Sequence, residues 1–328
     1  MKKPRLLLIL ILAVLPGPEA AAQPEPSPVR VAGWGVLGSR DGQFSYPLAL
    51  DVDPGGHVYV ADTRNHRIQV FDSTGVLLSK WGTLGTGPGQ FDGPAGICLD
   101  PSGNVYVVDH ENRRVQKFTR EGAFLREWGS RGSAPGQFET AGGIAADAAG
   151  NIYVVDGWEN FRISKFAPDG TLLFFWGSEG LGDGQFVAPR DIAVDAAGAV
   201  YVTDYLAQRV QKFTGDGVFL GKWGQEGMGD GDFLTPLGIA VDARGNVYVV
   251  DHHNFRVQKF TTSGVFLGKW GARTTRATIF DDPHGCAVDA HGCIFITDFG
   301  PLPTIQKWSY LGVAVLPRSW GAIKAMYR

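Results

Sequence analysis

The hydrophobic and polar positions of this chain follow a pattern that repeats about every 47 residues. In the copy at residues 236–271, a short apolar run is followed by a glycine turn, and then by the β-branched and aromatic run 247–250 that ends in Asp251. A third run (256–260) alternates polar with apolar residues, and a fourth (265–271) follows a second turn. This pattern predicts a four-stranded antiparallel meander. We expect its second strand to be buried on both faces and its third strand to lie nearer the outside.

The pattern occurs six times, at about residues 47–82, 94–129, 141–177, 189–224, 236–271 and 283–321. The aspartate that ends the second run recurs at intervals of 47, 47, 48, 47 and 47 residues. One such sheet cannot bury both of its apolar faces alone, whereas six sheets packed face to face around an axis can. The predicted fold class is therefore all-β: a six-bladed β-propeller of four-stranded antiparallel blades, forming one domain at residues 29–328.

The start of this domain repeats only the outermost strand and the loop after it, with Trp34-Gly35 and Gly42-Gln43-Phe44. In a closed propeller, such an isolated strand completes the last blade. Residues 312–321 offer a competing strand, but Pro317 lies inside it, and proline in a strand is confined to edges and ends. We therefore expect residues 29–35 to close the ring and the residues after Pro317 to form an outer or fifth edge strand.

Side chains that recur in every copy are assigned to the scaffold, because a catalytic residue has no reason to appear in each blade. Paired aspartate and arginine, such as Asp62 with Arg67 or Asp251 with Arg256, flank the loop between the second and third strands and are expected to hold it by charge-assisted hydrogen bonds. A phenylalanine before each first strand is expected to pack between blades. These are Phe44, Phe91, Phe138, Phe186, Phe233 and Phe280.

The motifs Pro-x-Gly-Ile-Ala-Val-Asp, Gly-Asn-Val-Tyr-Val-x-Asp, Asn-x-Arg-Val-Gln-Lys-Phe and Leu-x-x-Trp-Gly resemble NHL repeats over about residues 29–321. The resemblance implies the propeller fold, and it says little about function because this fold hosts many unrelated activities. NHL propellers of the tripartite-motif proteins bind nucleic acid through a basic face. The rim of this chain has few basic residues, and several aspartates oppose them, so we expect no nucleic-acid partner.

The chain also resembles peptidylglycine amidating lyase, a secreted NHL-propeller family in which histidines of three Pro-His motifs hold a catalytic zinc. Pro283-His284 matches such a motif. One ligand of three cannot hold a catalytic zinc, so we do not expect that lyase activity. The third copy has Ala141 in place of the proline, and the residues after the proline in the other copies are Leu48, Ala95, Arg190 and Leu237.

The first 22 residues contain a basic start, an apolar run at residues 6–15 and an alanine triplet that ends at Ala22. This composition predicts a secretory signal peptide at residues 1–22, cleaved after Ala22 and followed by a linker at residues 23–28. The apolar run is too short to cross a bilayer, which takes roughly 20 residues. We therefore expect a secreted or periplasmic protein without stable membrane insertion. Loss of the segment changes the formal net charge from −3 to −5, which gives no bulk attraction for nucleic acid.

The three cysteines, Cys98, Cys286 and Cys293, occupy ordinary strand or turn positions of the repeat. Their odd number argues against a disulfide framework. The predicted register places Cys286 opposite Ile296, away from Cys293. We expect all three to be small core residues.

Function is sought where the copies differ. In propellers, the loops before the first strand and between the second and third strands open onto one face, around the mouth of the central channel. The variable positions there are rich in aromatic and imidazole groups, and we predict that they form a binding surface. They are His66, His110, Trp158, Glu159, Tyr205, His252 and His253 in the loops, with Arg190 and His284 at the head of first strands.

Two of these residues suggest chemistry. Arg190 suits a carboxylate or phosphate, and His284 suits a metal ion or proton transfer. The alternatives are that Arg190 pairs with an acid such as Asp191 and that His284 is only solvated.

The sequence favours an exported, non-catalytic, monomeric propeller that binds a protein, peptide or glycan on its loop-rich face without a cofactor. Common hydrolase, zincin and phosphate-binding motifs are absent. The alternative is a metal-dependent, lactonase-like hydrolase or lyase that uses calcium or zinc at the channel mouth. Its candidate ligands are Asp51 and Asp191, which replace small residues in first strands, together with His284.

Overall fold

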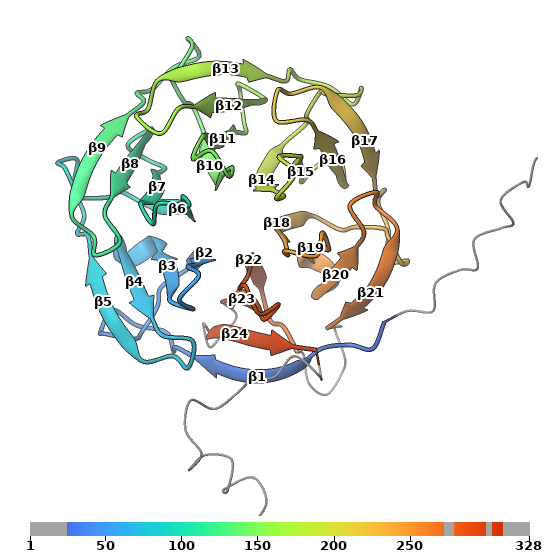
Figure 1. The fold of residues 1–328 in the computed structure, drawn as a ribbon, viewed down its shortest axis with the longest axis horizontal. Helices are drawn as coiled ribbons and strands as arrows, with labels where there is room; N and C mark the ends of the chain where they lie inside the picture. Colours follow the sequence, from blue (N-terminus) through green and yellow to red (C-terminus); the bar gives the residue numbers. More distant parts are fainter. Residues whose placement is uncertain (1–24, 272–278, 300–303, 311–328) are drawn as a thin grey trace, which may run out of the picture.

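Six four-stranded antiparallel sheets surround a central channel in the computed structural model, which describes residues 25–271, 279–299 and 304–310 (Figure 1). Within each blade the strands run outward from the channel in chain order, apart from the closing strand. The predicted all-β propeller is confirmed.

The six blades are numbered from the N-terminus, and their strand bounds follow the repeat. Blade 1 contains β2–β5 (Pro47–Val52, Val58–Asp62, Arg67–Phe71, Leu77–Trp81), and blade 2 contains β6–β9 (Pro94–Leu99, Val105–Asp109, Arg114–Phe118, Phe124–Trp128). Blade 3 contains β10–β13 (Ala141–Ala146, Ile152–Asp156, Arg162–Phe166, Leu172–Trp176), and blade 4 contains β14–β17 (Pro189–Val194, Val200–Asp204, Arg209–Phe213, Phe219–Trp223). Blade 5 contains β18–β21 (Pro236–Val241, Val247–Asp251, Arg256–Phe260, Phe266–Trp270), and blade 6 contains β22–β24 (Pro283–Val288, Ile294–Asp298, Thr304–Ser309) with β1 (Val29–Trp34).

The N-terminal strand closes the ring. β1 pairs antiparallel with β24 and supplies the outer strand of blade 6, so the first and last described strands lie in one sheet. The indole of Trp34 contacts the rings of Phe71 in blade 1 and Phe295 in blade 6, at centroid distances of 6.0 and 6.4 Å. The predicted closing strand is therefore confirmed. The competing strand at residues 312–321 and the predicted signal peptide lie outside the described residues.

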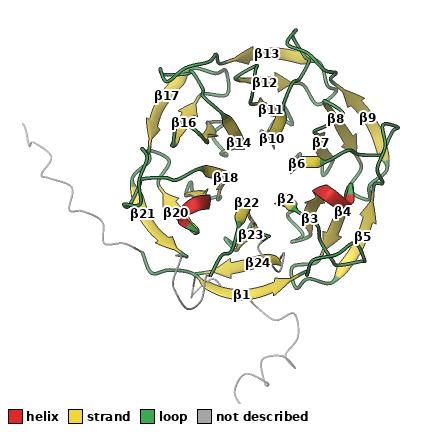
Figure 2. Ribbon diagram, turned by 180° about the vertical axis from the view of Figure 1, so that it is seen from behind, coloured by secondary structure: helices red, strands yellow, loops and turns green. Residues whose placement is uncertain are grey.

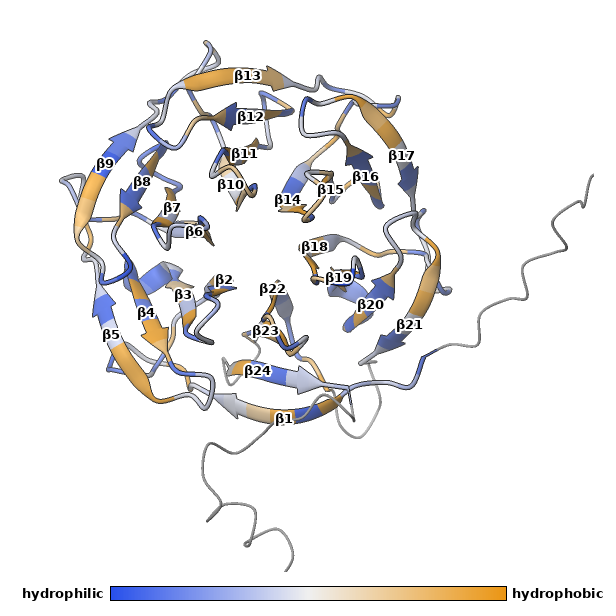
Figure 3. Ribbon diagram, in the orientation of Figure 1, coloured by the Kyte–Doolittle hydropathy of each residue, from blue (hydrophilic) through white to orange (hydrophobic). Residues whose placement is uncertain are grey.

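The apolar core lies between blades. Phe44, for example, is fully buried in a cluster that combines residues of blade 1 with Cys293, Phe295 and Ile305 of blade 6. All six repeat phenylalanines are fully buried, which confirms their predicted packing role. The three cysteines are buried and unbridged, as expected. The outer strands carry apolar residues on the circumference, orange in Figure 3, such as Leu173 in β13 and Leu220 in β17.

The repeated aspartate and arginine form the predicted scaffold network. In blade 1, Nε of Arg67 donates to Oδ2 of Asp62 at 2.7 Å, and the rest of the guanidinium donates to carbonyls of Ser39, Arg40 and Gln43. The side-chain amide of Gln69 donates a hydrogen bond to the same carboxylate. The third strand lies outside the second, as expected, and its polar residues such as Gln69 are nevertheless buried. These side chains tie the strand to the preceding loop.

Two single-turn 3-10 helices, η1 (Thr63–Asn65) and η2 (His252–Asn254), are the helical elements of the described residues. No helix in that part of the chain has the length and apolar character needed to cross a membrane.

Candidate functional site

Two sets of loops meet on one face of the ring. We call the loop between the second and third strands of a blade its bc loop, and the loop before the first strand its da loop. In blade 1, the amide of Arg64 in the bc loop donates to the carbonyl of Ser45 in the da loop, and Asn65 donates to Gly38. Figure 2 shows η1 and η2, which lie in the bc loops of blades 1 and 5, in red.

Neighbouring blades meet in a fixed register at this face. The first residue of each bc loop faces the head of the first strand in the next blade. Thr63 Oγ1 donates to the carbonyl of Pro94 at 2.8 Å, and Nδ1 of His110 lies 2.6 Å from the carbonyl oxygen of Ala141. Each junction therefore brings together the first bc residue of one blade and the residues before and after the proline position of the next.

The junction between blades 5 and 6 is the one at which all three positions can ligate a metal. The residues there are His252, Asp282 and His284, which we call the mouth triad. The other five junctions hold Thr63 with Gly93 and Ala95, His110 with Thr140 and Gly142, Gly157 with Ala188 and Arg190, Tyr205 with Thr235 and Leu237, and Phe299 with Tyr46 and Leu48.

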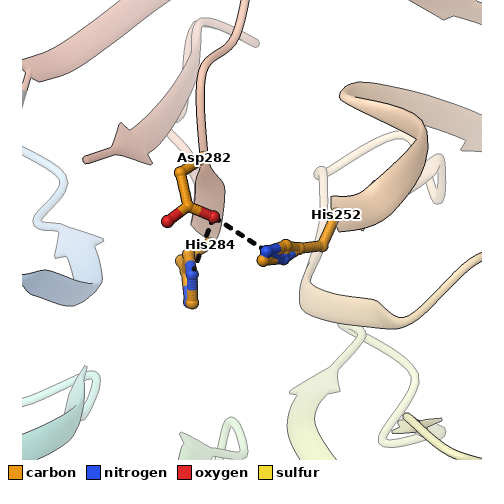
Figure 4. A group of neighbouring side chains, drawn as sticks. All are labelled: His252, Asp282 and His284. Carbon is orange, nitrogen blue, oxygen red and sulfur yellow. Dashed lines mark ion pairs between the residues drawn. The ribbon is translucent and has the colours of Figure 1, made fainter. Parts of the chain in front are cut away.

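Within the mouth triad, both imidazoles point their Nε2 atoms at one carboxylate oxygen (Figure 4). Asp282 Oδ1 lies 2.8 Å from His252 Nε2 and 3.4 Å from His284 Nε2. The side chains of the two histidines are 15% and 11% exposed. The ring of His284 lies between those of Phe299 and His252, at centroid distances of 4.2 and 4.7 Å, so its orientation is restricted on both sides.

The environment keeps both imidazoles neutral. Burial lowers the pKa of His252 to about 3, aided by repulsion from His284 and opposed by Asp282. Burial also lowers the pKa of His284, again against the influence of Asp282. The charge of Arg190 contributes to both shifts, and Arg190 and His284 line the same channel. A neutral imidazole keeps a nitrogen lone pair available for a metal ion or a hydrogen-bond donor.

A second unrepeated group adjoins the triad at the junction of blades 6 and 1. The ring of Tyr46 lies 3.9 Å from that of Phe299 and 5.9 Å from that of His284, and the guanidinium of Arg64 lies 4.4 Å above the Tyr46 ring. Tyr46 has a φ of 62° directly before Pro47, although residues before proline favour extended conformations. The equivalent residues Gly93 and Thr235 have φ values of 65° and 57°, so this conformation belongs to the repeat.

The remaining predicted rim residues are spread around the ring. Nδ1 of His66 accepts a hydrogen bond from the amide of Gly93, so His66, like His110, joins its loop to the next blade. Trp158 is 53% exposed. Glu159 and His253 are also exposed, whereas Tyr205 and Arg190 are half-buried. The ring of His253 lies 4.5 Å from that of His252, which adds His253 to the surroundings of the triad.

Asp51 and Asp191 lie in the wall of the channel, which encloses about 190 Å³. Each carboxylate joins two blades: the amide of Leu99 donates to Asp51 at 2.8 Å, and the amide of Ile239 donates to Asp191 at 3.1 Å. Burial raises the pKa of both to about 6, and the charge of Arg190 opposes the shift at Asp191. Asp51 and Asp191 belong to no potential metal-binding group among the described residues, whereas His284 belongs to the mouth triad.

The Asp191→Asn variant is expected to change the pH dependence of stability. Because the folded-state pKa is about 6 and the ordinary value is 3.8, the folded protein binds this proton more tightly, and its stabilising effect is lost as pH rises through 6. The asparagine does not ionise. Denaturant unfolding should show the variant gaining about 2 kcal/mol relative to wild type between pH 4.5 and 8. Asp216→Asn, at a strongly exposed carboxylate, is the control and should show no such gain. A pH-independent difference for Asp191→Asn would contradict the account.

Asp282, Tyr46 and Arg64 are site residues that the sequence analysis missed. Asp282 stands out in the sequence only when the residue before the proline position is compared across blades, because the other copies hold Tyr46, Gly93, Thr140, Ala188 and Thr235 there. Its neighbour His252 belongs to the previous repeat, so the pairing depends on the register between blades.

Comparisons with known proteins agree with the repeat and the fold. The model of the family described as NHL repeat matches residues 44–71, 91–118 and 233–260. The chain is 50% identical over 42 residues to B-box type zinc finger protein ncl-1 of Caenorhabditis elegans, and 55% identical over 40 residues to Protein wech of Drosophila melanogaster. These segments are 13% and 12% of this chain, and the chain spans about 5% of the length of either relative.

Solved structures are similar over most of the chain. A streptogramin B lyase matches with a TM-score of 0.61 at 14% identity, covering 84% of this chain and 96% of that one. A gluconolactonase from Xanthomonas campestris matches with a TM-score of 0.57 at 15% identity, covering 90% and 99%. At such identities the likeness concerns the fold alone. The chain therefore carries NHL repeats at the matched residues, and its fold is a six-bladed β-propeller.

Proposed function

We propose that this protein is an exported, non-catalytic propeller that binds a protein, peptide or glycan on the face formed by its bc and da loops. The observation that carries the proposal is the division between repeated and unrepeated side chains. The repeated aspartates and arginines are buried and hydrogen-bonded to the scaffold, whereas the unrepeated polar and aromatic residues lie in the bc loops and around the heads of the first strands. The basic start, apolar run and alanine triplet of the first 22 residues support export.

Arg190 is the anchor that we propose for an anionic group of the ligand. It lines the channel at the head of β14, close to the mouth triad, and it makes no salt bridge with any residue that the structure describes. A guanidinium suits a carboxylate or phosphate because it offers parallel donors. Trp158, half-exposed on the neighbouring bc loop, supplies apolar contact area of the kind that dominates binding energy at interfaces.

Trp158→Ala and Arg190→Ala are each expected to weaken partner capture by about tenfold, or about 1.4 kcal/mol, because truncating such an anchor typically costs more than about 1 kcal/mol. Thermal unfolding should shift by less than about 2 °C, as for most surface substitutions. Capture is measured by pull-down from a cell-envelope extract. One control is Leu220→Ala on the outer strand β17, where the leucine is as exposed as Trp158. The other is Arg244→Ala, in the exposed turn between the first and second strands of blade 5. Variants that lose stability and keep capture would refute the site.

The enzymatic alternative depends on a metal. The carboxylates of Asp51 and Asp191 are each engaged by a backbone amide of the next blade, and the positions that hold zinc in peptidylglycine amidating lyase carry a histidine only at His284. A lactonase-like hydrolase or lyase would therefore have to use the mouth triad. The fold likeness to a gluconolactonase and a streptogramin B lyase is compatible with such chemistry and does not locate a site.

A further inference from the structure

We propose that the mouth triad binds one divalent transition-metal ion, with Zn²⁺ as the simplest candidate, at the junction of blades 5 and 6. This goes beyond the proposed function, which needs no metal. The three side chains come from two points of the chain: His252 from the bc loop of blade 5, and Asp282 and His284 from either side of Pro283 at the start of β22.

The donor set fits this class of ion. Two imidazoles and one carboxylate are ligands that zinc takes in sites with an open position, and imidazole favours transition metals over calcium or magnesium, which prefer oxygen ligands. Three protein ligands leave at least one position for water or for an anionic atom of a ligand. The metal site itself does not rest on the proposed function. Only the idea that its open position takes part in partner capture rests on it.

The geometry fits as well. The three potential ligand atoms all lie within 4.8 Å of one another, and the two histidine Nε2 atoms lie 2.8 and 3.4 Å from Asp282 Oδ1. With metal–ligand bonds of about 2.0–2.1 Å, a tetrahedral ion separates its ligand atoms by about 3.3–3.4 Å. The His284–Asp282 distance already has this value. Metal binding requires the His252–Asp282 distance to open by about 0.5 Å and the two imidazole nitrogens, which lie within 4.8 Å of each other, to approach to about 3.4 Å.

The backbone around the triad is held by the scaffold. The amide of Asp282 donates to the repeat carboxylate of Asp298 at 2.7 Å, and the amide of His252 donates to the carbonyl of Thr235. Phe299 restricts the ring of His284. The ligands therefore start from fixed positions, which lowers the ordering cost of binding an ion.

The scaffold does not itself need these residues. The equivalent positions between blades 1 and 2 hold Thr63, Gly93 and Ala95, which pack in the same register without a carboxylate or an imidazole. At the equivalent positions between blades 2 and 3, His110 is the one imidazole, and its ring binds a backbone carbonyl. Ring assembly therefore explains neither the carboxylate of Asp282 nor the pair of histidines that faces it.

The test is calorimetric titration of Zn²⁺ into the chelator-treated full chain. Wild type should bind one equivalent at the triad, and Asp282→Asn and His284→Ala should each weaken that binding at least tenfold. His110→Ala removes the histidine at the matching bc position of blade 2 and should bind as wild type does. Zn²⁺ should raise the thermal midpoint of wild type and His110→Ala, with little effect on the two triad variants.

Absence of a stoichiometric Zn²⁺ site in folded wild-type protein would overturn the proposal, as would equal affinity in wild type and in folded Asp282→Asn. Circular dichroism of each ion-free variant establishes that it is folded. Trp158→Ala separates the two proposals, because it removes an uncharged, exposed side chain of blade 3. It should keep the Zn²⁺ affinity of wild type whether or not it captures a partner, so failure of the capture experiment leaves the metal result independent.

Discussion

A chain that begins at residue 37, and therefore lacks β1, is expected to lose at least about 5 kcal/mol of stability, with a thermal midpoint lower by 10 °C or more. The truncation removes the pairing of β1 with β24 and the packing of Trp34 on Phe71 and Phe295. Loss of a buried tryptophan side chain alone typically costs about 3–5 kcal/mol. Blade 6 would then lack its outer strand, and the junction of blades 6 and 1 would lack the packing of Trp34.

The matched control begins at Glu25 and keeps every described N-terminal residue. Scanning calorimetry compares the two chains, and limited proteolysis shows whether blade 6 opens first. A truncated chain that unfolds cooperatively within about 2 °C of the control would contradict closure by β1. Trp34→Ala in the full chain gives an intermediate case, with an expected loss of about 3 kcal/mol because its side chain is partly exposed.

Arg114→Ala is expected to lower the free energy of unfolding by about 3–5 kcal/mol, since removing one partner leaves a buried charge without compensation. Arg114 donates from Nε to the fully buried carboxylate of Asp109 at 2.8 Å, and its other nitrogens donate to carbonyls of Thr86, Gly87 and Gln90. The substitution removes the positively charged partner of this carboxylate, which keeps only uncharged donors from Asp92, Asn112 and Gln116. It also removes one donor from each of the three loop carbonyls.

Denaturant unfolding measures this loss, and Arg244→Ala at an exposed turn is the control, with an expected change within about 0.5 kcal/mol. A loss below 1 kcal/mol in Arg114→Ala would show that the network contributes little. Blade 6 offers a natural comparison. Its strand β24 begins with Thr304 at the arginine position, and burial raises the pKa of its aspartate, Asp298, to about 6.

Most of the fold follows from the sequence because the repeat encodes it locally. The strand pattern, the Gly-Gln-Phe motif and the Asp–Arg pair each lie within a single copy of the repeat. The additional Trp34-Gly35 before the first copy identifies the closing strand. The burial of Gln69 and its equivalents in the third strand is harder to predict, because an alternating pattern is also typical of a strand with one exposed face.

The site is less predictable because it forms between copies. Both histidines of the mouth triad are conspicuous as departures from the repeat, but Asp282 becomes meaningful only once the bc loop of blade 5 is known to face the head of blade 6. In the same way, Tyr46 and Phe299 are almost at opposite ends of the domain sequence and meet only because the ring closes. Contacts of this kind depend on closure and register, which a single copy does not contain.

The central claim is that repeated residues carry the fold and unrepeated residues at the mouth carry the function. The most direct test measures partner capture per folded molecule for Arg190→Ala and Arg114→Ala side by side, with the folded fraction taken from unfolding curves. The account predicts that Arg190→Ala loses about tenfold in capture at unchanged stability, and that Arg114→Ala loses stability while each folded molecule captures as wild type does. Unchanged capture by Arg190→Ala, or a loss explained by unfolding alone, would contradict it.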